Sequence, residues 1–272
     1  MRWLRSLEEY LELIEVSLDE GDFDEAEKLV GKVLKRWKTS TEAWTVAGEI
    51  AYEQGDPESG AKHFREGVKC SDVNAFSWGG LSKCLLEIGE SKEALDAAIE
   101  ATRLLPNDGD LVYALGVALE VNGELEAADA SYKEAKRLAP QIYFEPFRVS
   151  RDTFDSIAMT CFHGLPEEVK ESLGRIHIEI YDLPREVETE EGTPPLPPLL
   201  LGLFEGYSRA DESLEDPWST AFPSRIYLFQ RNIERACPDQ EELTRQVNIT
   251  LLHEIGHFLG LNESELELRG LD

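Results

Sequence analysis

The residues best suited to chemistry are His253-Glu254-Ile255-Gly256-His257. Two histidines four positions apart on a helix lie about 40 degrees apart around its axis and one turn along it, so both imidazoles can bind one zinc ion. Glu254 directly follows the first histidine and can take a proton from water at such a site. The segment therefore predicts a zinc centre with His253 and His257 as ligands and Glu254 as the general base.

A catalytic zinc ion needs a third protein ligand and one position that stays open. Gly260 lies three residues after His257, and Glu263 lies three residues after Gly260. On an unbroken helix Glu263 would face about 120 degrees away from His257, but a glycine in the left-handed conformation can turn the chain back. We expect Glu263 to be the third ligand, with Glu265 and Asn262 as alternatives.

A helix and several strands must position these residues. Asp239, with Glu242 three residues later, has the pattern of an N-cap and capping box that opens a helix running to about Leu259. Before this helix, hydrophobic patterning predicts a helical stretch and three strands. Their expected ranges are Asp152–Leu173 for the helical stretch, with a break near residues 164–166, and Arg175–Tyr181, Leu199–Phe204 and Ile226–Gln230 for the strands.

Two further roles are expected in this region. An exposed strand at Ile226–Gln230 is suited to pairing with an extended substrate by strand addition. A second donor beside the metal would stabilise the oxyanion of an acyl-transfer reaction, and Tyr207, Arg209 and Tyr227 are all candidates.

The first half of the chain carries an internal repeat. Glycines recur at intervals of 34 residues, small residues follow each glycine by five positions, and apolar residues precede it at helical spacing. A glycine permits the turn between two helices, and prolines close the last two units. The pattern predicts four helical hairpins over residues 7–142, with turn glycines at Gly21, Gly55, Gly89 and Gly123.

Both halves resemble known families. Residues 7–142 resemble tetratricopeptide repeats. Residues 150–270 resemble the small bacterial zincin-like metallopeptidases, whose motif is H-E-x-x-H-x-x-G-x-x-[ED]. Besides that motif, the similar segments are Leu165–Val169, Leu201–Gly206 and Pro223–Gln230. The resemblance implies a superhelical array of helical hairpins in residues 1–142. It implies a small α+β domain in residues 143–272, with a mixed sheet and an active-site helix near the C-terminus.

Repeats of the first type bind peptides or proteins in a groove lined by the first helix of each hairpin. The resemblance places a set of mostly acidic and aromatic positions in that groove. They are Glu49, Tyr52, Glu53, Lys83, Glu87, Asp110, Tyr113, Val117 and Glu120. Because an anionic ligand would meet like charge there, we expect a basic or an apolar helical partner.

Composition narrows the partners further. The 55 acidic and 27 basic residues give a formal net charge of -28, which disfavours nucleic acid and anionic membranes as partners. The longest apolar stretch falls short of the roughly 18 residues that a membrane span needs. Four scattered cysteines without a C-x-x-C pair are typical of reduced thiols, so we expect a cytoplasmic protein.

Together these features predict a zinc-dependent metallopeptidase with a protein-recruiting arm. The alternative is a scaffold or adaptor whose zinc site is structural or only weakly catalytic. Hydrolysis of a non-peptide amide is a third possibility.

Overall fold

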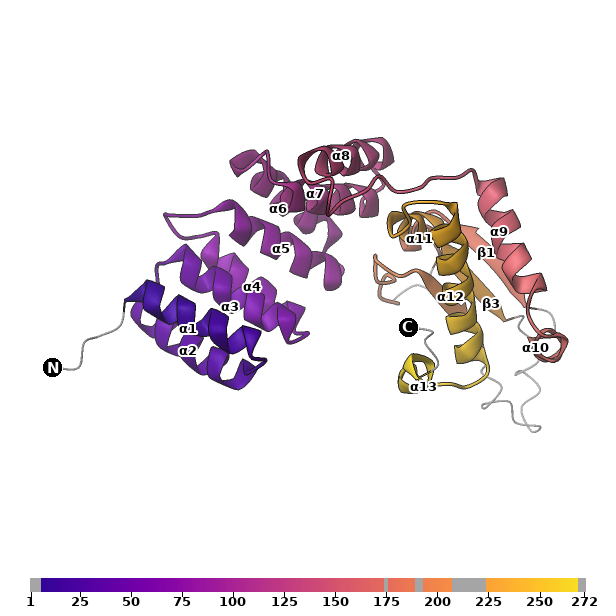
Figure 1. The fold of residues 1–272 in the computed structure, drawn as a ribbon, viewed down its shortest axis with the longest axis horizontal. Helices are drawn as coiled ribbons and strands as arrows, with labels where there is room; N and C mark the ends of the chain where they lie inside the picture. The colour runs from indigo at the N-terminus through magenta and orange to yellow at the C-terminus, as the bar shows by residue number, and fades with distance from the viewer. Residues whose placement is uncertain (1–5, 174–175, 189–192, 207–223, 269–272) are drawn as a thin grey trace. The chain divides into compact units, whose positions relative to one another are not determined.

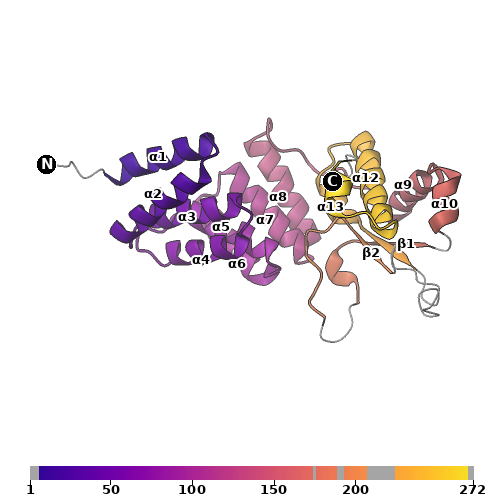
Figure 2. The ribbon, with the colours of Figure 1, turned by 90° about the horizontal axis from the view of Figure 1, so that it is seen from below.

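The structure is a computed structural model that describes residues 6–173, 176–188, 193–206 and 224–268. It divides into two units, Met1–Phe144 and Glu145–Asp272. The first is built from paired helices and the second combines a small sheet with helices (Figures 1 and 2). The predicted fold class, a helical-hairpin array followed by a small α+β domain, is confirmed.

Four helical hairpins make up the first unit. Each hairpin turns at a glycine with positive φ, and the four values of φ lie between 72° and 85°. These are the four glycines of the 34-residue register, so the turn chemistry was predicted correctly. The helices are α1 (Leu7–Asp19), α2 (Phe23–Arg36), α3 (Thr41–Glu53), α4 (Pro57–Gly67), α5 (Ala75–Glu87), α6 (Ser91–Leu104), α7 (Gly109–Val121) and α8 (Leu125–Leu138).

Small residues bring these helices close together. Ala26, Ala94 and Ala128 are fully buried at equivalent positions in their hairpins. The fourth residue of this set, Gly60, lies where an added Cβ atom would come within 2.8 Å of the Cys84 sulfur. The first helices of successive hairpins also pack on one another, α3 on α5 and α5 on α7. α3, α5 and α7 therefore form one continuous face of the unit.

The second unit contains a three-stranded sheet in the order β1-β3-β2. β3 pairs in parallel with β1 and antiparallel with β2, so the sheet is mixed, as predicted. The elements are α9 (Arg151–His163), α10 (Glu167–Leu173), β1 (His177–Tyr181), the 3-10 helix η1 (Pro184–Glu186), β2 (Gly202–Glu205), β3 (Arg225–Phe229), α11 (Gln230–Arg235), α12 (Gln240–Phe258) and α13 (Glu263–Glu267).

The expected role of Ile226–Gln230 as a substrate-pairing strand is wrong. β3 is the central strand, and both of its sides are taken by β1 and β2. Its burial fits this position, since Ile226, Leu228 and Phe229 are fully buried. Gln230 leaves the strand and begins α11, a short helix that the sequence pattern did not predict.

α12 and α9 cover one face of the sheet (Figure 1). Ile226 and Leu228 of β3 share a buried cluster with Leu251 and Ile255 of α12 and with Phe154 of α9. Side chains on a strand alternate between its faces, so Ile226 and Leu228 direct the same face of β3 toward α12. This cluster fixes the helix that carries the histidines against the sheet.

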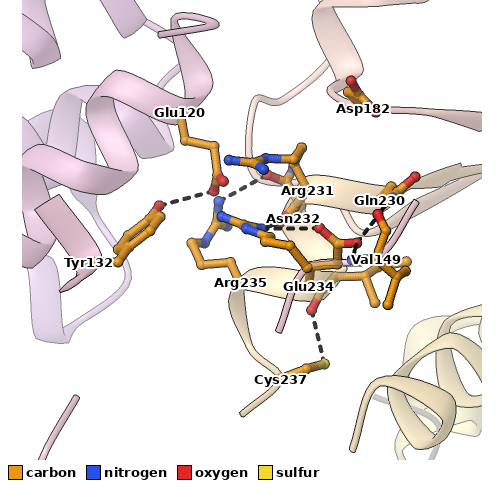
Figure 3. A network of polar contacts seen from close by, with 12 residues as sticks. Glu120, Tyr132, Val149, Asp182, Gln230, Arg231, Asn232, Glu234, Arg235 and Cys237 are labelled. Carbon is orange, nitrogen blue, oxygen red and sulfur yellow. Dashed lines mark hydrogen bonds and ion pairs between the residues drawn. The ribbon is translucent and has the colours of Figure 1, made fainter. Parts of the chain in front are cut away.

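A buried carboxylate ties the entry to the second unit onto α11 (Figure 3). Glu234 accepts hydrogen bonds from the Val149 amide at 3.0 Å and from Gln230 Nε2 at 2.8 Å, and it pairs with Arg148 at 3.4 Å. Gln230 Nε2 also donates to the Val149 carbonyl at 3.0 Å. Because Glu234 is almost fully buried, these donors replace part of the solvation that its charge would receive from water, and burial still raises the pKa of its carboxyl above the usual value.

The four cysteines differ in burial. All four cysteines are free thiols. Cys84 and Cys237 are buried, and burial raises the pKa of each thiol to about 12, so both act as apolar groups. Cys70 and Cys161 are only half-buried.

Within the described ranges, no helix combines the length and the apolar character that crossing a bilayer requires.

Candidate metal centre

The two motif histidines lie on the last turns of α12. Asp239 caps the helix by accepting from the Glu242 amide at 3.0 Å, as predicted, but Glu242 itself pairs with Arg245 and completes no capping box. His253 and His257 face one another one turn apart, with ring centroids separated by 4.7 Å and Nε2 atoms by 3.0 Å. One turn of helix thus brings two nitrogen donors to a common point.

A sharp bend follows α12. Gly260 has φ of +86°, so the left-handed conformation expected from the sequence is confirmed. Its amide donates to the His257 carbonyl and the Leu261 amide donates to the Gly256 carbonyl, each at 3.0 Å. This pair of hydrogen bonds is the Schellman motif, which closes a helix and reverses the chain direction. The bend therefore returns the following residues toward the histidines.

The third donor comes from the first turn of α13. The Glu263 carboxylate lies 3.3 Å from His257 Nε2 and 3.7 Å from His253 Nε2. The two alternatives from the sequence are engaged elsewhere: Asn262 caps α13, and Glu265 returns a hydrogen bond to the Asn262 amide. The side chain of Glu263 is 72% exposed, so this corner of the site opens to solvent.

The three donors suit a tetrahedral zinc ion. Ligand atoms about 2.0–2.2 Å from zinc in a tetrahedron lie about 3.3–3.6 Å from one another. The two Nε2 atoms lie 3.0 Å apart, and the nearest Glu263 oxygens lie 3.3 Å from His257 Nε2 (Oε1) and 3.7 Å from His253 Nε2 (Oε2), close to this range. All three donor atoms lie within 4.8 Å of one another. Two imidazoles and one carboxylate are also a donor set that catalytic zinc sites use.

Glu254 lies beside this cluster but is buried, with 6% of its surface exposed. Burial is the main cause that raises the pKa of its carboxyl to about 7. His253 and a hydrogen bond from the Phe204 amide act in the opposite direction, and the charge of Glu263 raises the pKa further. A carboxyl with this pKa exchanges protons near neutral pH, which is what a general base requires.

Gly202 at the start of β2 makes room for this carboxylate. An added Cβ atom at residue 202 would lie 2.8 Å from Glu254 Oε1 and 2.8 Å from the Cγ2 atom of Thr250. β2 thus contacts Glu254 through two features, the bare backbone of Gly202 and the amide of Phe204. Both residues belong to a segment that resembles the zincin-like family, but the sequence alone assigned them no role.

Of the three candidates for oxyanion stabilisation, the described residues include only Tyr227. Tyr207 and Arg209 lie outside the described residues. Tyr227 alternates with Ile226 and Leu228 on β3, so it faces away from α12. Its hydroxyl donates to Glu205 at 2.7 Å and accepts from Arg225 at 3.3 Å. The role considered for Tyr227 is therefore incompatible with this geometry.

The expected groove positions of the repeats separate into two groups. Glu49, Tyr52, Glu53 and Lys83 line a common pocket, and Glu87 lies within 3.5 Å of the Tyr52 hydroxyl. Farther along, other members of the set contact residues of their own unit. Asp110 accepts from the Tyr143 hydroxyl at 2.8 Å, and Tyr113 stacks on Tyr143. Val117 is half-buried.

Glu120 is not an accessible groove residue. Its side chain is buried and accepts a hydrogen bond from Tyr132 at 3.0 Å (Figure 3). Phe76, which was not among the predicted groove positions, lines the pocket with Glu49 and Tyr52. Phe76 lies 34 residues before Asp110, so applying the register consistently would have found it.

Comparison with known proteins assigns both halves of the chain. Residues 11–75 and 83–141 match the family model of the tetratricopeptide repeat. Residues 173–271 match the model of the zincin-like metallopeptidase. The chain therefore combines an N-terminal tetratricopeptide repeat array with a C-terminal zincin-like metallopeptidase domain, as the motifs predicted.

Several solved structures are similar to part of the chain. A crystal structure of MamA is 25% identical over 47% of this chain and 74% of that chain, with a TM-score of 0.43. MamA from Desulfovibrio magneticus RS-1 is 22% identical over 49% of this chain and 76% of that one, with a TM-score of 0.44. The repeat protein YrrB is 18% identical over 48% of this chain and 68% of that chain, with a TM-score of 0.43. No curated protein sequence matches the chain.

Proposed function

We propose that the protein is a zinc-dependent peptidase whose repeat array recruits a protein partner or substrate. One observation carries the catalytic part of the proposal: three donor side chains converge within 4.8 Å of one another beside a buried carboxyl with a pKa of about 7. A structural metal site gains nothing from an adjacent base. His253, His257 and Glu263 would hold the metal, and Glu254 would be the catalytic base. A cytoplasmic location stays a prediction.

The chain's own residues move the proton in this proposal. Zinc, when bound, polarises a carbonyl oxygen and acidifies a water molecule. Glu254 accepts the proton of the attacking water on its carboxylate and passes it to the leaving amine. The Phe204 amide holds that carboxylate in place through its hydrogen bond. The helix and β2 therefore orient the base before any substrate binds.

β2 is the strand best placed to align a substrate. Among the described strands it lies at the edge of the sheet next to β3. The Phe229 amide donates to the Leu201 carbonyl, so Leu203 and Glu205 also form hydrogen-bonded pairs with β3, while the backbone of Gly202 and Phe204 points away. Because the Phe204 amide already donates to Glu254, an extended peptide added beside β2 would pair with Gly202 and lie next to that carboxylate.

The repeat array supplies the recruiting function. Its acidic and aromatic pocket residues support the prediction of a basic or an apolar helical partner. Binding of a partner there would not require the metal site, so the two activities can be measured separately.

The test compares the wild-type chain with Glu254→Gln. Both proteins are assayed for bound zinc and for hydrolysis of a mixed peptide library. We expect one zinc ion per chain in each and hydrolysis lowered by about 10²–10⁴-fold in the variant, because the base is lost while the ligands remain. Glu263→Ala serves as the companion variant and should lose zinc. Equal hydrolysis by wild type and Glu254→Gln would contradict the peptidase.

One observation favours the alternative of a zinc-binding scaffold. The only oxyanion candidate within the described residues, Tyr227, faces the opposite side of the sheet. In that case the zinc site would stabilise residues 239–267, and the repeats would perform the function. Bound zinc without hydrolysis of any library peptide or small amide would identify the scaffold.

A further inference from the structure

The first unit contains a pocket of about 540 Å³, formed mainly by the first helices of successive hairpins, with Phe23 of α2 and Phe64 of α4 completing it. This volume lies within the range of roughly 300–1,000 Å³ that ligand sites occupy. We call it the acidic aromatic pocket. Its apolar lining consists of Leu18, Phe23, Phe64, Phe76 and Leu111, and its polar lining of Asp19, Glu49, Tyr52, Glu53 and Lys83.

The apolar part of the pocket is open to solvent. Phe76 is 53% exposed and Phe23 is 37% exposed, although both are large aromatic residues. Gly80 contributes no side chain to the lining, and an added Cβ atom there would lie 2.2 Å from the Phe64 ring. The missing side chain lets Phe64 form the floor of the pocket. Exposed aromatic surface around a hollow favours an apolar ligand.

The charges at the pocket are unbalanced. Three acids, Asp19, Glu49 and Glu53, line it against the single cation of Lys83. The Lys83 ammonium lies 4.0 Å from the centroid of the Tyr52 ring, so part of its charge is directed at that aromatic face. Burial, and then the charge of Glu53, raises the pKa of Glu49 above its usual value. A ligand cation beside Glu49 and Glu53 would relieve this crowding of negative charge.

We infer that the acidic aromatic pocket binds a peptide segment in which bulky apolar side chains are flanked by lysine or arginine. The apolar side chains would cover Phe76 and Phe23, and the cations would pair with Glu49 and Glu53. A peptide with acidic residues or a free carboxylate at this place would meet like charge. The inference rests on the recruiting arm of the proposed function and specifies the chemistry of its partner.

The experiment selects binders from a displayed library of random twelve-residue peptides. The bait is the full chain carrying Glu254→Gln, so that bound peptides are not cleaved. We expect enrichment of peptides with aromatic or large aliphatic residues next to lysine or arginine. A labelled peptide of the enriched class is then titrated against variants of the same bait.

A charge-removing double substitution and a single aromatic substitution locate the binding. Glu49→Gln with Glu53→Gln should raise the Kd about five- to tenfold, and Phe76→Ala should raise it about tenfold or more. The matched control, Glu58→Gln with Glu126→Gln, removes the same charge from exposed positions outside the pocket and should leave the Kd unchanged. Circular dichroism confirms that each variant is folded.

Three results would overturn the inference: no enrichment, enrichment of acidic peptides, or a Kd that the pocket variants leave unchanged. None of these results bears on hydrolysis, which is measured with the wild-type chain. Conversely, a chain that hydrolyses no peptide can still give the expected selection. The failure of the pocket and the failure of the peptidase are therefore distinguishable.

Discussion

At the scale of single residues, the position of Glu254 depends on residue 202 being a glycine, which has no side chain. Gly202 lets β2 lie against the carboxylate, and any larger residue would meet Glu254 Oε1 at 2.8 Å. The Glu254 side chain, together with the Thr250 methyl group that lies equally close, would have to move. A base displaced by about 1 Å can lose on the order of 10²-fold in rate.

We therefore expect Gly202→Ala to lower kcat about 10²-fold while the chain still binds one zinc ion. The measurement pairs steady-state kinetics with zinc content. Gly31→Ala is the control, because an added Cβ atom at Gly31 in α2 has no neighbour within 4 Å. Loss of zinc together with activity in Gly202→Ala would show instead that the whole site had been disrupted.

At the scale of elements, the bend between α12 and α13 determines whether Glu263 reaches the histidines. Gly260 adopts a conformation that costs other residues roughly 1–2 kcal/mol. We expect Gly260→Ala to weaken zinc binding about tenfold, as measured by competition with a chelating dye. Gly260→Asn should weaken it less, since asparagine tolerates the left-handed conformation better. Equal affinity in all three chains would mean that the bend does not position the ligand.

The anchoring of α11 makes a separate prediction about stability. Glu234→Ala removes the acceptor for the Val149 amide and for Gln230, and it leaves Arg148 without this carboxylate. Breaking a buried ion pair in this way costs roughly 3–5 kcal/mol. We expect that loss in the free energy of unfolding from urea denaturation. Asp155→Ala, at an exposed position of α9, should change it by less than about 0.5 kcal/mol.

The same scale shows what the sequence could predict. The helix cap at Asp239, the histidine pair and the bend at Gly260 are local features, so spacing alone predicted them correctly. The turn glycines of the repeats could also be predicted, because they recur at a fixed interval of 34 residues. Each of these features depends on residues that lie within about one hairpin of one another in the sequence.

Features that depend on distant pairing were missed. The position of β3 at the centre of the sheet depends on its pairing with β1, whose partner residues lie 48 positions earlier. The contact between Gly202 and Glu254 likewise joins residues far apart in sequence. The repeat register predicts Glu120 as a groove residue, because the spacing of residues along one helix does not reveal its hydrogen bond with Tyr132 on the next helix.

At the scale of the whole molecule, the two units are stabilised in different ways. The repeats bury small residues between helices that are neighbours in sequence, whereas the second unit depends on a compact cluster around α12. Only the second unit contains the three converging donors among the described residues. A ligand stabilises the part of the chain that binds it, by about 2.7 kcal/mol at a concentration 100 times its Kd.

We expect removal of zinc by a chelator to increase hydrogen exchange in residues 240–267 and to leave residues 7–138 unchanged. Mass spectrometry of peptic fragments measures both regions in one sample. The Glu263→Ala chain, which should not hold zinc, should show no response to the chelator. An equal increase in both units would contradict an assignment of the metal to the second unit.

The order of the two units along the chain has a consequence for biosynthesis. The repeats make mainly local contacts, and such topologies fold quickly, while the parallel pairing of β1 with β3 must wait for a long intervening segment. At about 5–20 residues per second on the ribosome, Glu263 emerges roughly 6–25 s after the last repeat helix. The repeat array is then already folded when the three metal donors come together, so under the proposed function a newly made chain would hold a partner before it could cleave it.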